Sequence, residues 1–139
     1  MYLSNSQRMW TLVQVAIALV LSLLVGACGE EDKQTAQAVQ WLETYSQTNP
    51  PNKEWQLTHA GADDKGQVVM DVLVPDQGQV DLIKSRTRVE QDHIVRMACP
   101  LKHAKIWTLL PEGRMLWVNL QEKMPDGSFQ PITGASCKR

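Results

Sequence analysis

The sequence predicts an α+β domain in which a helix, a β-hairpin, a second helix and a second β-hairpin follow one another. Three observations predict this class: two segments have apolar residues at helical spacing, four segments alternate apolar and polar residues, and turn-forming residues separate the alternating pairs. Such elements form a core by packing helices against a sheet. We therefore expect a four-stranded antiparallel sheet with helices on one face, preceded by an N-terminal hydrophobic helix.

The first helix is expected over residues 34–48. Ala38, Val39 and Leu42 recur at helical spacing, and the prolines at positions 50 and 51 cannot continue a helix. Two strands are expected next, at residues 54–60 and 67–74, because apolar residues alternate in both. The segment between them is rich in turn formers, so these strands are expected to pair as an antiparallel hairpin.

The second helix is expected over residues 80–97, a stretch without proline or glycine. Residues 102–110 fit one helical turn or a buried strand, and we favour a short helix. The second hairpin is expected to join residues 114–122 and 128–137 through a turn at Pro125-Asp126-Gly127. Because a proline nitrogen has no hydrogen to donate, Pro131 places the returning strand at an edge of the sheet.

An uncharged, mostly apolar run lies between Arg8 and Gly29, and three acidic residues follow at positions 30–32. A run of this kind inserts into a membrane, and the single positive charge before it keeps the N-terminus in the cytoplasm. The rest of the chain is therefore expected on the far side of the membrane.

The run ends in Val25-Gly26-Ala27-Cys28, which resembles the lipobox of bacterial lipoproteins. The resemblance implies that the signal peptide, residues 1–27, is removed and that Cys28 carries the lipid. Residues 28–33 would then be a short tether and residues 34–139 a single exported domain. The alternatives are an uncleaved anchor helix, giving a single-pass inner-membrane protein, and a plain cleaved signal. Because Gly29 is not the aspartate that retains many lipoproteins at the inner membrane, the resemblance implies the outer membrane in a Gram-negative cell.

Once Cys28 is assigned to the lipid, Cys99 and Cys137 remain as a pair in a compartment that permits disulfides. We expect them to bond, which would stabilise the domain by about 3 to 4 kcal/mol through loop closure. The alternative is a reactive Cys99 thiol that uses His103 as a base or as a second ligand.

Positive charge is concentrated in residues 84–105, where Glu90 and Asp92 are the only acids. An ordinary solvated surface accounts for such charges in most proteins. The alternative is a site for a lipid headgroup or another anionic partner, since a lipidated protein lies close to an anionic membrane. The candidate contacts are Lys84, Arg86, Arg88, Arg96, Lys102 and Lys105.

No common catalytic pattern is present: the chain has no G-x-S-x-G, no P-loop and no C-x-x-C. His59, His93 and His103 do not have the spacing of a metal site. We expect no enzyme activity, no catalytic residue, no metal and no cofactor. A formal charge of −1, which becomes −2 if Arg8 leaves with residues 1–27, gives no general attraction to nucleic acid.

The C-terminal part of the chain is similar to small exported domains of the quorum-sensing-regulated virulence factor group. The residues that carry this resemblance are Cys99, Leu109-Leu110, Gly113, Asp126-Gly127 and Cys137. It implies a fold and a disulfide, and it offers no catalytic residue to carry over.

The sequence therefore predicts an envelope lipoprotein that acts as a non-enzymatic, protein-binding assembly or accessory module. One alternative is a lipid or small-ligand binder that uses the basic residues 84–105. The other is an uncommon thiol enzyme or hydrolase built around Cys99 and His103.

Overall fold

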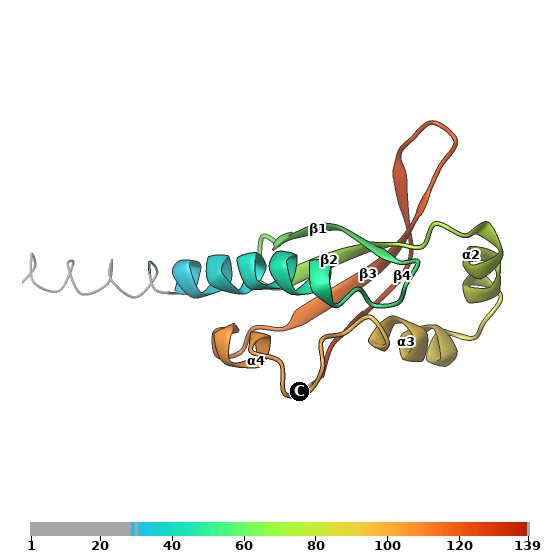
Figure 1. Cartoon of the computed structure of the whole chain (residues 1–139). Coiled ribbons are helices and arrows are strands. Elements are labelled where there is room, and N and C mark those ends of the chain that lie inside the picture. The colour runs from blue at the N-terminus through green and yellow to red at the C-terminus, as the bar shows by residue number, and fades with distance from the viewer. Residues whose placement is uncertain (1–28, 30, 139) are drawn as a thin grey trace, which may run out of the picture. The chain divides into compact units, whose positions relative to one another are not determined.

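A computed structural model describes residue 29 and residues 31–138 of the chain. The expected signal peptide, residues 1–27, and the expected lipidation site, Cys28, lie outside the described residues. Residues Gln34–Arg139 form one compact unit. Its elements are the helix of residues 31–48, β1 (Gln56–Ala62), β2 (Val68–Leu73), α2 (Gln77–Lys84), α3 (Arg88–Arg96), α4 (Ile106–Leu109), β3 (Leu116–Lys123) and β4 (Phe129–Ser136) (Figure 1).

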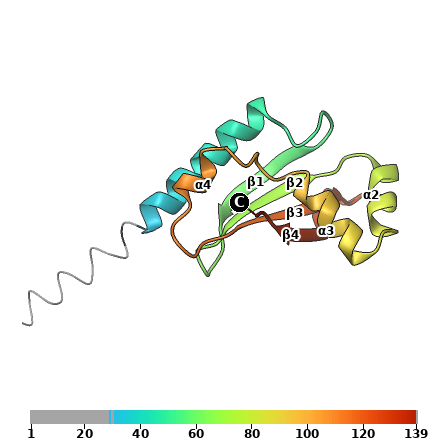
Figure 2. The same ribbon diagram turned by 90° about the horizontal axis from the view of Figure 1, so that it is seen from below.

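The α+β class and the four strands are confirmed, but the sheet is mixed rather than antiparallel. Its order is β1-β2-β3-β4, as the labels in Figure 2 show. Each hairpin is antiparallel, whereas β2 and β3 are parallel, with Val68 opposite Leu116 and Leu73 opposite Gln121. A parallel pair needs a long crossover, and the three helices between β2 and β3 supply it.

The single helix expected over residues 80–97 is wrong, because two helices occupy this region. Asp76 caps the start of α2 by accepting a hydrogen bond from the Gln79 N–H. Thr87 begins α3 with a capping box, in which its side chain accepts from the Glu90 N–H and the Glu90 carboxylate accepts from the Thr87 N–H. A threonine in this role has extended backbone geometry, so it separates the two helices.

The core lies on one face of the sheet. Alternate residues of β2 and β3 are buried there, and the helices contribute Leu42, Val95 and Ile106, each with 0% of its surface exposed. Because neighbouring strand residues point to opposite faces, burial of every second residue leaves the other face without a helical layer. The expectation that helices cover one face agrees with this pattern.

Two local expectations are confirmed. Residues 106–109 form the short helix α4, and β4, which carries Pro131, is an edge strand. The segment expected to be a tether is helical at residues 29 and 31–33. Within the described part of the chain, none of the helices combines the length and the apolar character needed to cross a membrane.

Candidate functional site

The two remaining cysteines form the expected bond. Cys99 follows α3 and Cys137 follows β4, and their sulfur atoms are 2.02 Å apart. The bridge fastens the end of the chain to the helical layer, next to a hydrogen bond of 2.8 Å from the Cys137 N–H to the Leu116 carbonyl. The alternative role of Cys99 as a reactive thiol needs a free sulfur, which this disulfide takes up.

The six basic residues of segment 84–105 lie at the ends of α2 and α3 and in the segments that follow these helices. Most of them have partners within the domain: Lys84 pairs with Glu122 at 2.6 Å, Arg86 with Glu90 at 3.7 Å and Arg96 with Asp92 at 2.7 Å. Arg88 donates hydrogen bonds to the Thr133 hydroxyl and the Gly134 carbonyl.

Lys102 and Lys105 are exposed and form no ion pair within the described region. They lie in the loop that follows α3, close in sequence to Met97 and Leu101, whose surfaces are 66% and 58% exposed. Met97 and Leu101 both line a hollow beside the disulfide. Lys84, Arg86 and Arg96 also keep 47%, 45% and 35% of their side-chain surfaces exposed, so Lys102 and Lys105 differ from them in having no ion-pair partner among the described residues.

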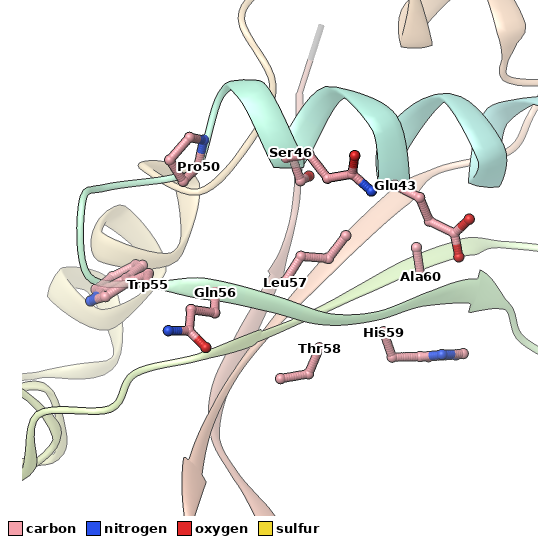
Figure 3. Close-up of a pocket in the computed structure, with 10 residues that line it drawn as sticks. Glu43, Ser46, Pro50, Trp55, Gln56, Leu57, Thr58, His59 and Ala60 are labelled. Carbon is pink, nitrogen blue, oxygen red and sulfur yellow. The ribbon is translucent and has the colours of Figure 1, made fainter.

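A separate groove of about 420 Å³ lies between the helix of residues 31–48 and β1 (Figure 3). Its helical wall consists of Glu43, Ser46 and Gln47, and its other wall includes every residue from position 56 to position 60. Neighbouring residues of a strand point to opposite faces of a sheet. A groove that touches five consecutive residues must therefore run along the backbone edge of the strand.

Within the part of the chain that the structure describes, no strand pairs with β1 on this side, because β1 is an outer strand of the sheet. The Asp63 N–H donates to the Gln67 carbonyl, and hydrogen-bonded pairs alternate along an antiparallel ladder. The N–H and C=O groups of Gly61 therefore face β2, whereas those of Ala60 and Ala62 face the free edge of the sheet.

Two contacts fix the end of the groove at Trp55. The backbone N–H of Trp55 donates to Asn52 Oδ1 at 2.7 Å, and its indole N–H donates to Gln79 Oε1 at 2.8 Å. The Gln79 amide in turn donates to the Glu54 carboxylate. Trp55 is 7% exposed, so this tryptophan belongs to the core and fixes the start of β1.

The opposite edge of the sheet is protected. Arg88 reaches from α3 to β4, where its guanidinium donates hydrogen bonds to the Gly134 carbonyl at 3.1 Å and to the Thr133 hydroxyl at 2.9 Å. Pro131 removes one N–H from the same strand. Basic side chains and proline are common means of preventing another strand from pairing with an edge. The two edges of the sheet are therefore not equivalent.

The uncovered face of the sheet carries an ordered row of polar side chains. The Trp117 indole N–H donates to Asn119 Oδ1 at 2.8 Å, and the Asn119 amide donates to Asp71 Oδ1 at 2.9 Å. A Cβ atom at Gly134 would lie 2.8 Å from the indole nitrogen, so glycine leaves the space that the ring occupies. Trp117 is 36% exposed and presents a fixed aromatic surface.

The alternating pattern predicts Trp55 and Trp117 on strands; Trp117 lies in β3, whereas Trp55 directly precedes β1. The pattern did not reveal the groove or the polar row. Asp71 and Asn119 face each other only because β2 and β3 are parallel in this register. The free edge of β1 likewise follows from the order of the strands. No local pattern identifies either feature.

Among the described residues, two carboxylates have a shifted pKa, and both belong to caps or turns. The Thr87 hydroxyl, followed by the Thr87 N–H, lowers the pKa of Glu90, and the Ser128 hydroxyl and N–H lower the pKa of Asp126. No group of three or more histidines, cysteines and acids suited to a metal ion occurs among the described residues. No protein-family model, curated protein or solved structure matches this chain.

Proposed function

We propose that the protein is a lipid-anchored protein of the cell envelope whose domain, residues 34–139, binds another envelope protein as a non-enzymatic assembly or accessory module. The anchor would be the lipid on Cys28, and the domain would lie on the extracytoplasmic side of the membrane, at the outer membrane in a Gram-negative cell. The Val25-Gly26-Ala27-Cys28 sequence and the uncharged run before it support this location. The Cys99–Cys137 bond fits an oxidising compartment.

The observation that carries the binding role is the groove along β1. Sites for small molecules usually enclose most of the ligand, whereas this groove runs along a strand edge on the surface (Figure 3). Its walls present backbone groups and the polar side chains of Glu43 and Gln47. A polypeptide is the kind of ligand that such a surface fits best.

Cross-linking in native membranes tests this function. The full chain, with its lipid anchor intact, is cross-linked and purified, and we expect an identified envelope protein in a constant ratio to it. A chain exported with an ordinary cleaved signal in place of residues 1–28 should lose membrane attachment and most of the cross-link, because the anchor raises the local concentration of the two proteins. A chain that is recovered without a reproducible partner would contradict the proposal.

A second candidate function is contact with an anionic lipid surface, and the exposed pair Lys102 and Lys105 favours it. Basic residues beside exposed apolar ones, here Met97 and Leu101, suit the boundary of a membrane. The test uses the chain exported with a cleaved signal, which has neither residues 1–28 nor the lipid, and phosphatidylglycerol vesicles at low and high salt. Binding that is lost at high salt, and lost when Lys102 and Lys105 become glutamine, supports this function. Salt-independent binding, or no binding, contradicts it.

A further inference from the structure

The free edge of β1 shows what form a partner would take. Ala60 and Ala62 each have one N–H donor and one C=O acceptor on the free edge. Ala60 lines the groove and is 7% exposed, whereas Ala62 is exposed and lies just beyond the lining residues. Unpaired strand edges of this kind bind extended peptides, which add a strand to the sheet. Since Arg88 and Pro131 protect the edge of β4, strand addition is directed to one side of the sheet.

The negative charge of Glu43 in the groove adds a requirement on the sequence of the partner's segment. Figure 3 shows Glu43 reaching from the helix toward Ala60, on the side where Leu57 and Ala60 point, while Thr58 and His59 project to the other side. Glu43 is exposed and forms no ion pair in the described part of the chain. A strand lying beside Ala60 would place every second side chain on the side of the helix, and one of these side chains would lie next to the Glu43 carboxylate.

From these contacts we infer that β1 accepts an extended segment of a partner protein as a fifth strand, with a lysine or arginine of that segment facing Glu43. This inference rests on the proposed function, because it names the form and charge of the partner's binding segment. Hydrogen bonds to Ala60 and Ala62 supply affinity, and the pairing with Glu43 selects a basic residue on the side facing the helix.

Amide hydrogen exchange on the full chain in phosphatidylcholine nanodiscs tests the inference. The probes are two short synthetic peptides, one alternating valine with lysine and the other alternating valine with glutamate. The lysine peptide should bind and slow exchange at Ala60 and Ala62 by about tenfold or more. The glutamate peptide should bind at least about tenfold more weakly.

Two variants test the two contacts separately. Ala62→Pro removes one donor at the edge, where proline is tolerated, and Glu43→Lys reverses the selecting charge without touching the backbone. Each should weaken binding of the lysine peptide by about tenfold. Glu112→Lys is the matched control, because Glu112 is exposed and does not line the groove. It should bind like the unmodified chain.

Several results would overturn the inference. These are failure of the lysine peptide to bind, binding that leaves Ala60 and Ala62 unprotected, or binding by Ala62→Pro and Glu43→Lys that is as tight as binding by the unmodified chain. Concentration-dependent protection of Ala60 and Ala62 without peptide would assign the edge to a second copy of this chain, and would also overturn it. If both variants still cross-link to the native partner, the inference fails while the proposed function stands. If the unmodified chain has no native partner, the proposed function itself fails.

Discussion

The Lys84 ammonium lies 2.6 Å from the Glu122 carboxylate and joins α2 to β3. Glu122 continues the core-facing series of Leu116, Val118 and Leu120, and only 10% of its side-chain surface is exposed. A carboxylate in such a position requires a partner, because an unpaired charge with little access to water is costly. Lys84 supplies that partner while 47% of its own side chain stays in solvent.

Replacing Lys84 by methionine should lower the free energy of unfolding by about 1 to 2 kcal/mol, because the change leaves the Glu122 carboxylate without its partner. The estimate lies below that for a fully buried pair, since Lys84 is half exposed. Urea unfolding measures the change. The double variant Lys84→Met with Glu122→Leu should recover much of the lost free energy of unfolding. A further decrease equal to the sum of the two single effects would contradict this account of the pair.

Removing the α3 cap should destabilise the domain by about 1 kcal/mol. Thr87→Ala deletes the hydroxyl that the Glu90 N–H uses, and loss of an N-cap typically has this cost. Thermal unfolding checks the value. Thr87→Ser keeps the hydroxyl and should remain close to the unmodified chain, so an equal loss in both variants would contradict the role of the cap.

The same cap makes stability depend on pH. Hydrogen bonds from Thr87 lower the pKa of Glu90 in the folded chain below its ordinary value of 4.5. The resulting stabilisation is complete above that value and is lost as the pH falls through the folded pKa. The difference in stability between the unmodified chain and Thr87→Ala should therefore shrink as the pH falls below 4.5. NMR titration should also show a higher Glu90 pKa in the variant, and an unchanged pKa would contradict the assignment.

Removing the disulfide should lower the free energy of unfolding by about 3 to 4 kcal/mol, because the bond closes a long loop in the unfolded chain. The variant is Cys137→Ser, and chemical unfolding with and without reductant measures the effect. Reductant should destabilise the unmodified chain by a similar amount and leave the variant unchanged. Equal stability of the two chains without reductant would contradict the prediction.

Gly134→Ala should displace the Trp117 ring and lower the free energy of unfolding by about 1 to 3 kcal/mol through overpacking. The added Cβ would lie 2.6 Å from Asn119 Oδ1 and 2.8 Å from the indole nitrogen. The indole N–H resonance of Trp117 should shift, since its hydrogen bond to Asn119 is lost. In a chain that also carries Trp117→Ala, the same substitution should lower the free energy of unfolding by less. An equal decrease would show that the strain does not come from the Trp117 ring.

Local pattern alone predicted the first helix, both hairpins, the short helix α4, the edge position of Pro131 and the pairing of Cys99 with Cys137. Each depends on spacing within a few residues or on counting cysteines. The break at Thr87 was also present in the sequence, because Thr87 and Glu90 have the spacing of a capping box. A stretch without proline or glycine favours one continuous helix, but the capping box at Thr87 begins a second helix in the folded chain.

The tertiary structure alone decided how the hairpins join. Three helices return the chain to the starting end of β2, so β3 lies parallel to it and Asp71 meets Asn119. Strand order also leaves β1 with a free edge while Arg88 covers β4, and it places Glu122 within reach of Lys84. The amino-acid sequence determines each strand through local alternation of side chains. Which strands become neighbours depends on burying a shared core, and only the folded chain as a whole satisfies that condition.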